Sequence, residues 1–221
     1  MIEYESLKFR WLGHDGFIIS NEAGTRVAID PFKIEGDFDP VDVLISTHEH
    51  FDHCHPDSMK KLVSSKTEVI GIPMAKKTLE TLNCKKLHYV APGDTLTVGN
   101  LNFEFVASYN VNKYRDPDKG IHFHPKADKK IGVVMEMDGH RIYHAGDSDH
   151  IPEMADIKTD VALLPVSGTY VMTADEAIEA AKTLNPKLAI PMHFGTIVGE
   201  RAMADKFAKS VTCEVKIPEL E

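Results

Sequence analysis

The stretch that decides the fold is Ser46 to Asp57, "STHEHFDHCHPD", which places four histidines, three carboxylates and one cysteine in twelve residues. It directly follows the apolar run "VDVLIS", whose β-branched composition indicates a strand. Residues two positions apart in an extended backbone project to the same side, so His48 and His50 can share one cation. Asp52 and His53 follow where the chain turns toward the next predicted helix, which suits a second cation.

Metal chemistry explains this composition better than chance does. Zinc and similar borderline metals favour imidazole and carboxylate ligands, and a catalytic site keeps one coordination position for water. Hydrolysis is the natural use of such a water. The alternative, a histidine-rich surface loop without a role, is disfavoured because the spacing is more specific than a single metal-type residue. Cys54 could reach a metal, but a lone cysteine is more often a buried, unreactive thiol.

Length and charge limit the classes of protein that this chain can represent. The 221 residues, 43% of them hydrophobic, predict one globular domain over residues 1–221. The net charge of -9, from 25 Lys and Arg against 34 Asp and Glu, repels polyanions, so nucleic acid is not an expected partner. A small molecule is the expected partner, and the sequence leaves the oligomeric state open.

The sequence also predicts a cytoplasmic protein. The start, "MIEYESLKFRWLGHDG", lacks the pattern of a secretory signal, and no run approaches the roughly 18 apolar residues of a membrane span. Three cysteines at wide spacing fit reduced thiols better than a disulfide framework.

Periodicity predicts an α/β protein with two packed sheets and helices outside. Strand patterns occur at "FRWLG", "GFIIS", "TRVAID" and "VDVLIST", and later at "LNFEFVAS", "VALLPV" and "LAIPMH". Helical patterns occur at "PDSMKKLVSS" and "PMAKKTLETLN", and from Thr173 to about Leu184, where Thr173 and Glu176 form a capping box. Asp138-Gly139 predicts a tight hairpin turn.

Residues 112–130 lack periodicity and are predicted to form a long functional loop. If this loop covers a cleft, its basic side chains could attract a phosphate or carboxylate of a substrate. These basic residues are Lys113, Arg115, Lys119, Lys126, Lys129 and Lys130.

The pattern His-x-His-x-Asp-His after a strand resembles the signature of the metallo-β-lactamase fold superfamily. Three further motifs resemble that family in the expected order: "AIDP" with Asp30, "YHAGDS" with Asp147 and "IPMHFG" with His193. The resemblance implies a four-layer αββα sandwich with the metal site at one edge. It also implies that Asp30 supports the metal loop by accepting a ring N–H of a ligand, and that Asp147 bridges two metals.

The ligand set implied by the resemblance is His48, His50, Asp52, His53, Asp147 and His193. Such a site would bind one or two zinc ions, a binuclear centre in the latter case, with Mn, Ni or Fe as other candidates. The metal would lower the pKa of a bound water to about 7. Asp52 would be the catalytic residue, orienting the hydroxide or accepting its proton.

The longer stretches "WLGHDGFII" and "PVSGTYVMTADEAIEAAKTLNPKLAIPMHFGT" resemble small metal-dependent hydrolases related to ascorbate-6-phosphate lactonase. This narrower resemblance implies hydrolysis of a small ester, lactone or phosphoester, with anionic substrates among the candidates. His14 is either a group near the substrate or the metal, or a polar residue in a glycine-flanked turn.

One expected ligand is missing from the sequence. The superfamily usually supplies a further histidine after a mid-chain strand, but here "LNFEFVAS" runs into Tyr109 and Asn110. Asn110 is a weak ligand at best. Either a loop histidine, His122 or His124, replaces the missing one, or the first metal is held loosely.

Two other functions remain open from the sequence. A phosphodiesterase of the ribonuclease Z kind shares the histidine motif, although the acidic charge disfavours RNA binding. A non-enzymatic metal-binding or sensor protein could keep the fold without turnover. The name of the fold does not imply antibiotic hydrolysis, because a fold does not determine a function.

Overall fold

The computed structural model describes residues 1–220 and confirms the predicted α/β class. The chain forms two compact units: unit 1 comprises residues 1–90 with 218–220, and unit 2 comprises residues 91–217. Each unit contains one seven-stranded sheet. Among residues 1–220, no helix has the length and apolar character needed to cross a bilayer.

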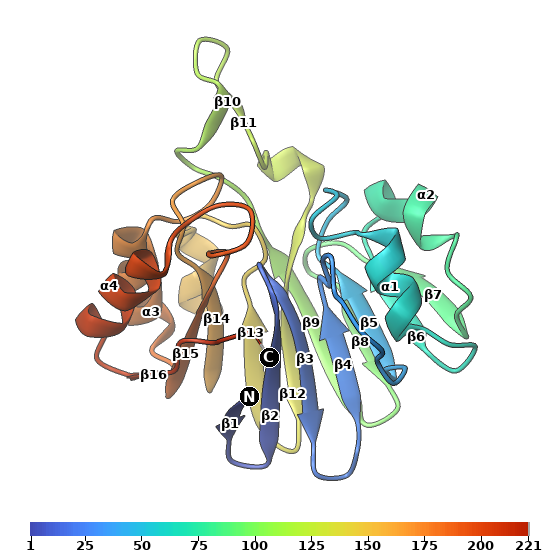
Figure 1. Cartoon of the computed structure of the whole chain (residues 1–221). Helices are drawn as coiled ribbons and strands as arrows, with labels where there is room; N and C mark the ends of the chain where they lie inside the picture. Colours follow the sequence, from blue (N-terminus) through green and yellow to red (C-terminus); the bar gives the residue numbers. More distant parts are fainter. Residues whose placement is uncertain (221) are drawn as a thin grey trace. The chain divides into compact units, whose positions relative to one another are not determined.

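Unit 1 is built on a sheet whose strands follow chain order, first antiparallel and then parallel. The strands are β1 (Ile2–Tyr4), β2 (Leu7–Gly13), β3 (Gly16–Asn21), β4 (Arg26–Ile29), β5 (Val43–Ser46), β6 (Glu68–Gly71) and β7 (Lys86–Tyr89). The helices are α1 (Pro56–Leu62), the 3-10 turn η1 (Pro73–Ala75) and α2 (Lys76–Leu79). Figure 1 shows α1 and α2 beside the parallel strands β5 to β7.

Buried side chains fix the register of unit 1. Phe9 pairs with Ile19 across β2 and β3, and both side chains are almost completely buried. A one-residue slip would turn such side chains toward solvent, and each full burial contributes about 1.5–3 kcal/mol. The parallel half needs crossover connections, and the connection from β5 to β6 carries the histidine-rich stretch. That stretch therefore leaves the carboxyl end of a buried strand.

Unit 2 repeats the arrangement of an antiparallel half followed by a parallel half. Its sheet contains β8 (Thr95–Val98), β9 (Leu101–Ala107), β12 (Ile131–Met137), β13 (His140–His144), β14 (Val161–Pro165), β15 (Leu188–Met192) and β16 (Glu214–Val215). Its helices are η2 (Lys126–Asp128), η3 (Pro152–Asp156), α3 (Ala174–Leu184) and α4 (Arg201–Ser210). Helix α3 packs against β14 and α4 against β15 (Figure 1).

The predicted long loop is only partly irregular, so that prediction was wrong for its central part. Strands β10 (Tyr114–Asp116) and β11 (Ile121–His122) form a small hairpin, and Figure 1 shows this hairpin projecting from the large sheet of unit 2. The rings of Tyr114 and His122 stack with centroids 4.5 Å apart. Cross-strand pairing and this stacking supply the order that the local composition does not indicate.

Two local predictions in unit 2 are confirmed. Asp138 and Gly139 have φ values of 52° and 78° and join β12 to β13, as a two-residue hairpin turn requires. Thr173 caps α3 by accepting the Glu176 amide, and the Glu176 side chain accepts the Thr173 amide. Both hydrogen bonds of the capping box are therefore present.

Glu176 also ties the hairpin segment to α3. Its carboxylate accepts hydrogen bonds from Asn112 Nδ2 (2.6 Å) and from Lys113 Nζ (2.8 and 3.0 Å). Desolvation raises its pKa, but the bonds from Asn112, Lys113 and the Thr173 amide lower it more, to about 2. This carboxylate therefore stays ionised in the folded chain far below its ordinary range.

We expect this network to make stability depend on pH on the acid side. The folded pKa of Glu176 is about 2 against an ordinary value of 4.5, so its contribution is complete above pH 4.5 and is lost as pH falls toward 2. In Glu176→Gln, which can keep the cap, the urea midpoint should fall less between pH 5 and pH 2.5 than it does in the wild type. Glu179→Gln, on the exposed side of α3, is the control, and equal pH slopes for Glu176→Gln and the wild type would contradict the prediction.

Candidate metal centre

Most metal-type residues of unit 1 lie in the loop after β5. Hydrogen bonds within this loop hold it in a compact turn. Ser46 Oγ donates to the carbonyl oxygen of His48 at 2.9 Å and lies 3.3 Å from the carbonyl oxygen of His53. The amides of His53 and Cys54 both donate to the carbonyl of His50, at 3.0 and 2.8 Å. As a result the ring centroids of His48 and His53 are 4.0 Å apart, and those of His48 and His50 are 4.7 Å apart. His48 thus lies beside both of the other imidazoles.

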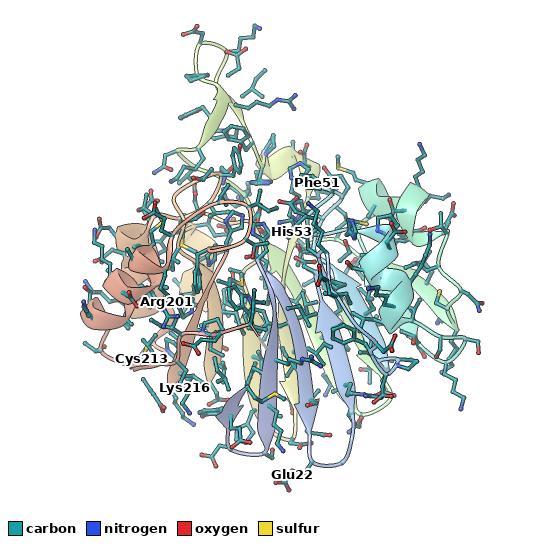
Figure 2. The ribbon with its side chains drawn as sticks, in the orientation of Figure 1. Glu22, Phe51, His53, Arg201, Cys213 and Lys216 are labelled. Carbon is teal, nitrogen blue, oxygen red and sulfur yellow. The ribbon has the colours of Figure 1, made fainter. Side chains whose placement is uncertain are left out.

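This loop lies at one end of the unit 1 sheet. In Figure 2, Phe51 and His53 lie at the end opposite Glu22, which follows β3. His53 is buried, whereas Phe51 is 64% exposed. The loop therefore combines a buried ligand-type side chain with an exposed apolar one two residues away.

Asp30 holds this loop in place from the end of β4. The residue is fully buried and has φ 46°, a left-handed conformation that Asp tolerates better than most residues. Its Oδ1 accepts the Thr47 amide at 2.8 Å, and its Oδ2 accepts the Thr47 hydroxyl at 2.6 Å and His53 Nδ1–H at 2.8 Å. Because Nδ1 of a neutral His53 carries the proton in that bond, Nε2 keeps its lone pair for a metal.

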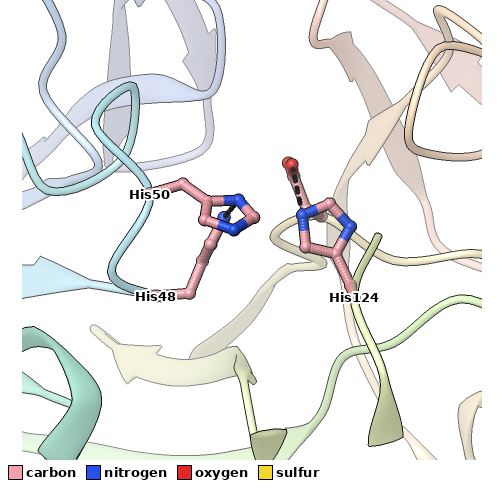
Figure 3. Close-up of side chains that lie close together, drawn as sticks. His48, His50 and His124 are labelled. Atoms are coloured by element: carbon pink, nitrogen blue, oxygen red, sulfur yellow. Dashed lines mark hydrogen bonds and ion pairs between the residues drawn. The ribbon is translucent and has the colours of Figure 1, made fainter. Parts of the chain in front are cut away.

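The protonation of His48 follows from the same chain of bonds. Thr47 gives its only hydroxyl proton to Asp30, so its oxygen accepts Nδ1–H of His48 at 3.1 Å. His48 Nε2 is then a lone-pair donor, and it lies 3.1 Å from His50 Nδ1; Figure 3 shows the two rings. Two ligands sharing a zinc-sized cation would have their donor atoms about 2.9–3.4 Å apart. The spacing of these two nitrogens fits a shared cation.

Asp52 lies among further imidazoles of unit 1. Its Oδ2 is 3.2 Å from His14 Nε2 and 3.9 Å from His53 Nε2. His14 directly follows β2, is buried and has φ 53°. Of the two positions considered from the sequence, it therefore occupies the one beside the predicted metal ligands. Asp15 was not singled out from the sequence, yet it is fully buried with Oδ2 3.9 Å from His53 Nδ1. Its only sequence signal is its place next to His14.

In unit 2, Asp147 lies between two histidines. It follows β13, and its Oδ2 is 3.3 Å from His124 Nε2 while its Oδ1 is 3.5 Å from His193 Nε2. The dashed line at His124 in Figure 3 marks the first of these contacts. All three side chains are almost completely buried. Each carboxylate oxygen thus faces a different imidazole at a separation that also suits ligands of a common cation.

The structure distinguishes the two loop histidines named from the sequence. His124 is buried beside Asp147, whereas His122 lies on β11, and its Nε2 is 3.3 Å from the carbonyl of Val111. Asn110 Oδ1 accepts both the His124 amide (2.9 Å) and His124 Nδ1–H (3.1 Å). Asn110 therefore orients His124 so that Nε2 points at Asp147, which is a positioning contact rather than a ligand position.

The basic residues of segment 112–130 are largely paired with carboxylates of unit 2. Lys113 contacts Glu176 and Asp149, and Lys126 contacts Glu153 at 2.6 Å. Lys119 and Lys130 lie near Asp116 and Asp128 respectively. Paired side chains attract a distant anion weakly, so this segment gives little support to the expectation of an anionic substrate.

Cys54 is buried, and desolvation raises the pKa of its thiol. Such a thiol is typical of the buried, unreactive role expected for a lone cysteine.

The donor set fits a borderline divalent metal. Within each unit the ligand-type atoms are imidazole nitrogens and carboxylate oxygens, and the hydrogen bonds that Asp30, Thr47 and Asn110 accept from the Nδ1 atoms leave ring lone pairs facing other ligand atoms of the same unit. Such facing lone pairs repel one another unless a cation or a proton lies between them. Zinc is bound by ligands of this kind, with the ring N–H groups held as observed here.

Comparison with known families identifies a match over most of the chain. Residues 8–193 match the model of the β-lactamase superfamily domain. A UPF0173 metal-dependent hydrolase of Koribacter versatilis is 30% identical, with 97% of this chain and 96% of that protein covered. One of Thermoplasma acidophilum is also 30% identical, with coverages of 98% and 97%.

Solved structures show the same architecture. A protein of Parabacteroides distasonis described as a metal-dependent hydrolase is 32% identical with a TM-score of 0.80, covering 97% of this chain and 94% of that one. Igni18, a metallo hydrolase of Ignicoccus hospitalis, is 22% identical with a TM-score of 0.73, and the coverages are 96% and 95%. The second comparison supports the fold alone.

Proposed function

The chain belongs to the metallo-β-lactamase superfamily, and we propose that this metal-dependent hydrolase uses a metal-activated water on a small ester, lactone or phosphoester. Relatives that match nearly the whole chain are named metal-dependent hydrolases. The observation that carries the proposal is the arrangement of His48, His53 and His124: the Nδ1 atom of each ring is hydrogen-bonded, and its Nε2 atom faces another ligand atom.

The proposal assigns metal ligands in both units. In unit 1 they are His48, His50, Asp52 and His53, and in unit 2 they are Asp147, His193 and His124. His124 supplies the mid-chain imidazole that the sequence pattern lacked. One or two zinc ions are proposed, with Mn, Ni or Fe as the other candidates. When bound, such a cation lowers the pKa of water to about 7 and polarises a scissile carbonyl or phosphoryl oxygen.

Asp52 is the proposed proton acceptor of the reaction. Its carboxylate is partly accessible, with 17% of the side chain exposed, whereas His53 beside it is buried. It would take a proton from the attacking water as the new C–O or P–O bond forms, and it would pass that proton to the leaving oxygen as the bond from that oxygen to carbon or phosphorus breaks. The His14 contact at 3.2 Å holds the orientation of this carboxylate.

The other two functions considered from the sequence receive less support. A ribonuclease Z-like activity would require binding a polyanion, and the chain has a net charge of -9 with the segment 112–130 lysines largely paired. A non-enzymatic metal sensor is disfavoured because the matching relatives are named hydrolases. No specific observation favours either function.

Metal removal tests the proposal. We expect the purified protein to contain one or two divalent ions per chain, and chelation to abolish hydrolysis of at least one substrate from a panel of aryl esters, lactones and aryl phosphoesters. Adding back zinc or manganese should restore the activity, with magnesium as the control because it prefers oxygen ligands. Full activity of a metal-free sample, or a protein that binds no divalent ion, would refute the proposed function.

A further inference from the structure

The side chain of His193 is held by a residue that neither the motif nor the family match assigns. His193 follows β15, has φ 59° and is fully buried. Its Nδ1 lies 2.8 Å from Ser167 Oγ, and its Nε2 lies 3.5 Å from Asp147 Oδ1. The two nitrogens of this ring thus have separate neighbours, a hydroxyl on one side and a carboxylate on the other.

We infer that Ser167 is a positioning residue that holds His193 with Nε2 directed at Asp147, ready to act as a metal ligand. This inference rests on the proposed metal binding and adds to it a residue of this chain. Ser167 is 5% exposed and lies just after β14 in the segment "PVSGT". It contacts the imidazole and the main chain, and it is not proposed to touch substrate or metal.

The hydrogen bonds of Ser167 make it suited to a ligand histidine. Its hydroxyl also lies 3.3 Å from the Thr169 carbonyl oxygen, to which it can donate, and it accepts the Thr169 amide at 3.3 Å. A hydroxyl has one proton and can give it to the Thr169 carbonyl. Its oxygen then accepts Nδ1–H of His193, so that Nε2 keeps the lone pair that a metal needs.

The backbone around Ser167 leaves the hydroxyl little freedom to move. A Cβ atom built on Gly199 would lie 2.7 Å from the Ser167 Cβ and 3.1 Å from the His193 carbonyl oxygen, and Gly199 has φ 73°. The chain after His193 therefore approaches Ser167 as closely as only glycine allows. The Gly195 amide donates to the Gly199 carbonyl at 3.1 Å and closes this turn. The contact between Ser167 and His193 is thus built into a tight backbone arrangement.

Substitution of Ser167 should weaken metal binding without unfolding the chain. In Ser167→Ala we expect about a 10–100-fold loss of zinc affinity in competition with a chromogenic chelator, the range found for partners of metal-bound histidines. The matched control is Thr67→Ala in unit 1, which removes a buried hydroxyl bonded to the Val41 carbonyl and the Ser64 amide.

A spectroscopic readout separates positioning from general destabilisation. In ¹⁵N-labelled, zinc-loaded protein, long-range correlations of the ring should show His193 with the proton on Nδ1, and Ser167→Ala should broaden or change this signature. Equal zinc affinities for the wild type and Ser167→Ala, together with an unchanged ring signature, would overturn the role of Ser167 and leave the proposed function intact. A wild type that binds no zinc would instead refute the proposed function itself.

Discussion

Replacing Asp30 with alanine is expected to destabilise the chain by about 3–5 kcal/mol and to remove most of its bound metal. The carboxylate accepts three hydrogen bonds, from the Thr47 amide, the Thr47 hydroxyl and His53 Nδ1. All of these donors are buried, and none has solvent to replace the lost acceptor. Alanine would in addition occupy a left-handed conformation at φ 46° that Asp accepts more readily.

The effect on metal follows from the same bonds. Without Asp30, the Thr47 hydroxyl is no longer committed as a donor, so the proton on His48 Nδ1 loses its fixed acceptor. His53 loses its partner directly. Two imidazoles would then be free to rotate or to carry the proton on Nε2, and each such change removes a ligand.

Urea unfolding and metal analysis measure the two effects in the same samples. Asp30→Asn keeps the shape of the side chain but places an NH₂ group opposite the Thr47 hydroxyl and His53 Nδ1. Its stability and metal content should therefore lie between those of the wild type and Asp30→Ala. Asp42→Asn is the matched control, because Asp42 also accepts a main-chain amide, from Arg26, but is exposed. The prediction fails if Asp30→Ala keeps both its metal and a free energy of unfolding close to that of Asp42→Asn.

Much of the fold could be predicted from the sequence, because its strands are short, β-branched and separated by turn residues. Helix α3 was predictable from its capping box, a signal carried by two residues three positions apart. Helix α4 was not predicted, and its N-cap Glu200 makes no side-chain cap bond that could have marked the start. The hairpin of β10 and β11 was missed because strands of three and two residues are too short to show a period.

The candidate site divides in the same way between local and distant signals. His48, His50, Asp52 and His53 stand in one motif, so spacing alone indicated their chemistry. The contacts of His124 with Asn110 and Asp147 span 14 and 23 residues and depend on how unit 2 folds. Sequence reasoning could name His124 as an alternative to His122, but only tertiary contacts separate the two.

Replacing His124 with alanine, but not His122, is therefore expected to cost the protein a metal ligand. His124 is buried with Nε2 3.3 Å from Asp147, and its Nδ1–H is held by Asn110 at 3.1 Å. His122 lies on the projecting hairpin, stacked on Tyr114. Removing a residue that only hydrogen-bonds to a metal ligand lowers metal affinity roughly 10–100-fold. We expect a larger loss of metal affinity in His124→Ala, because this substitution removes the ligand itself.

The substitution of Asn110 gives the graded comparison. Asn110→Ala removes the acceptor for the amide and Nδ1–H of His124 but leaves the imidazole, so its loss of affinity should be about 10–100-fold and smaller than that of His124→Ala. Metal content after dialysis and competition with a chromogenic chelator rank the three variants. The expected order of affinity is His122→Ala close to the wild type, then Asn110→Ala, then His124→Ala. If His122→Ala lost metal and His124→Ala did not, the assignment would be wrong and His122 on β11, not His124, would be the ligand.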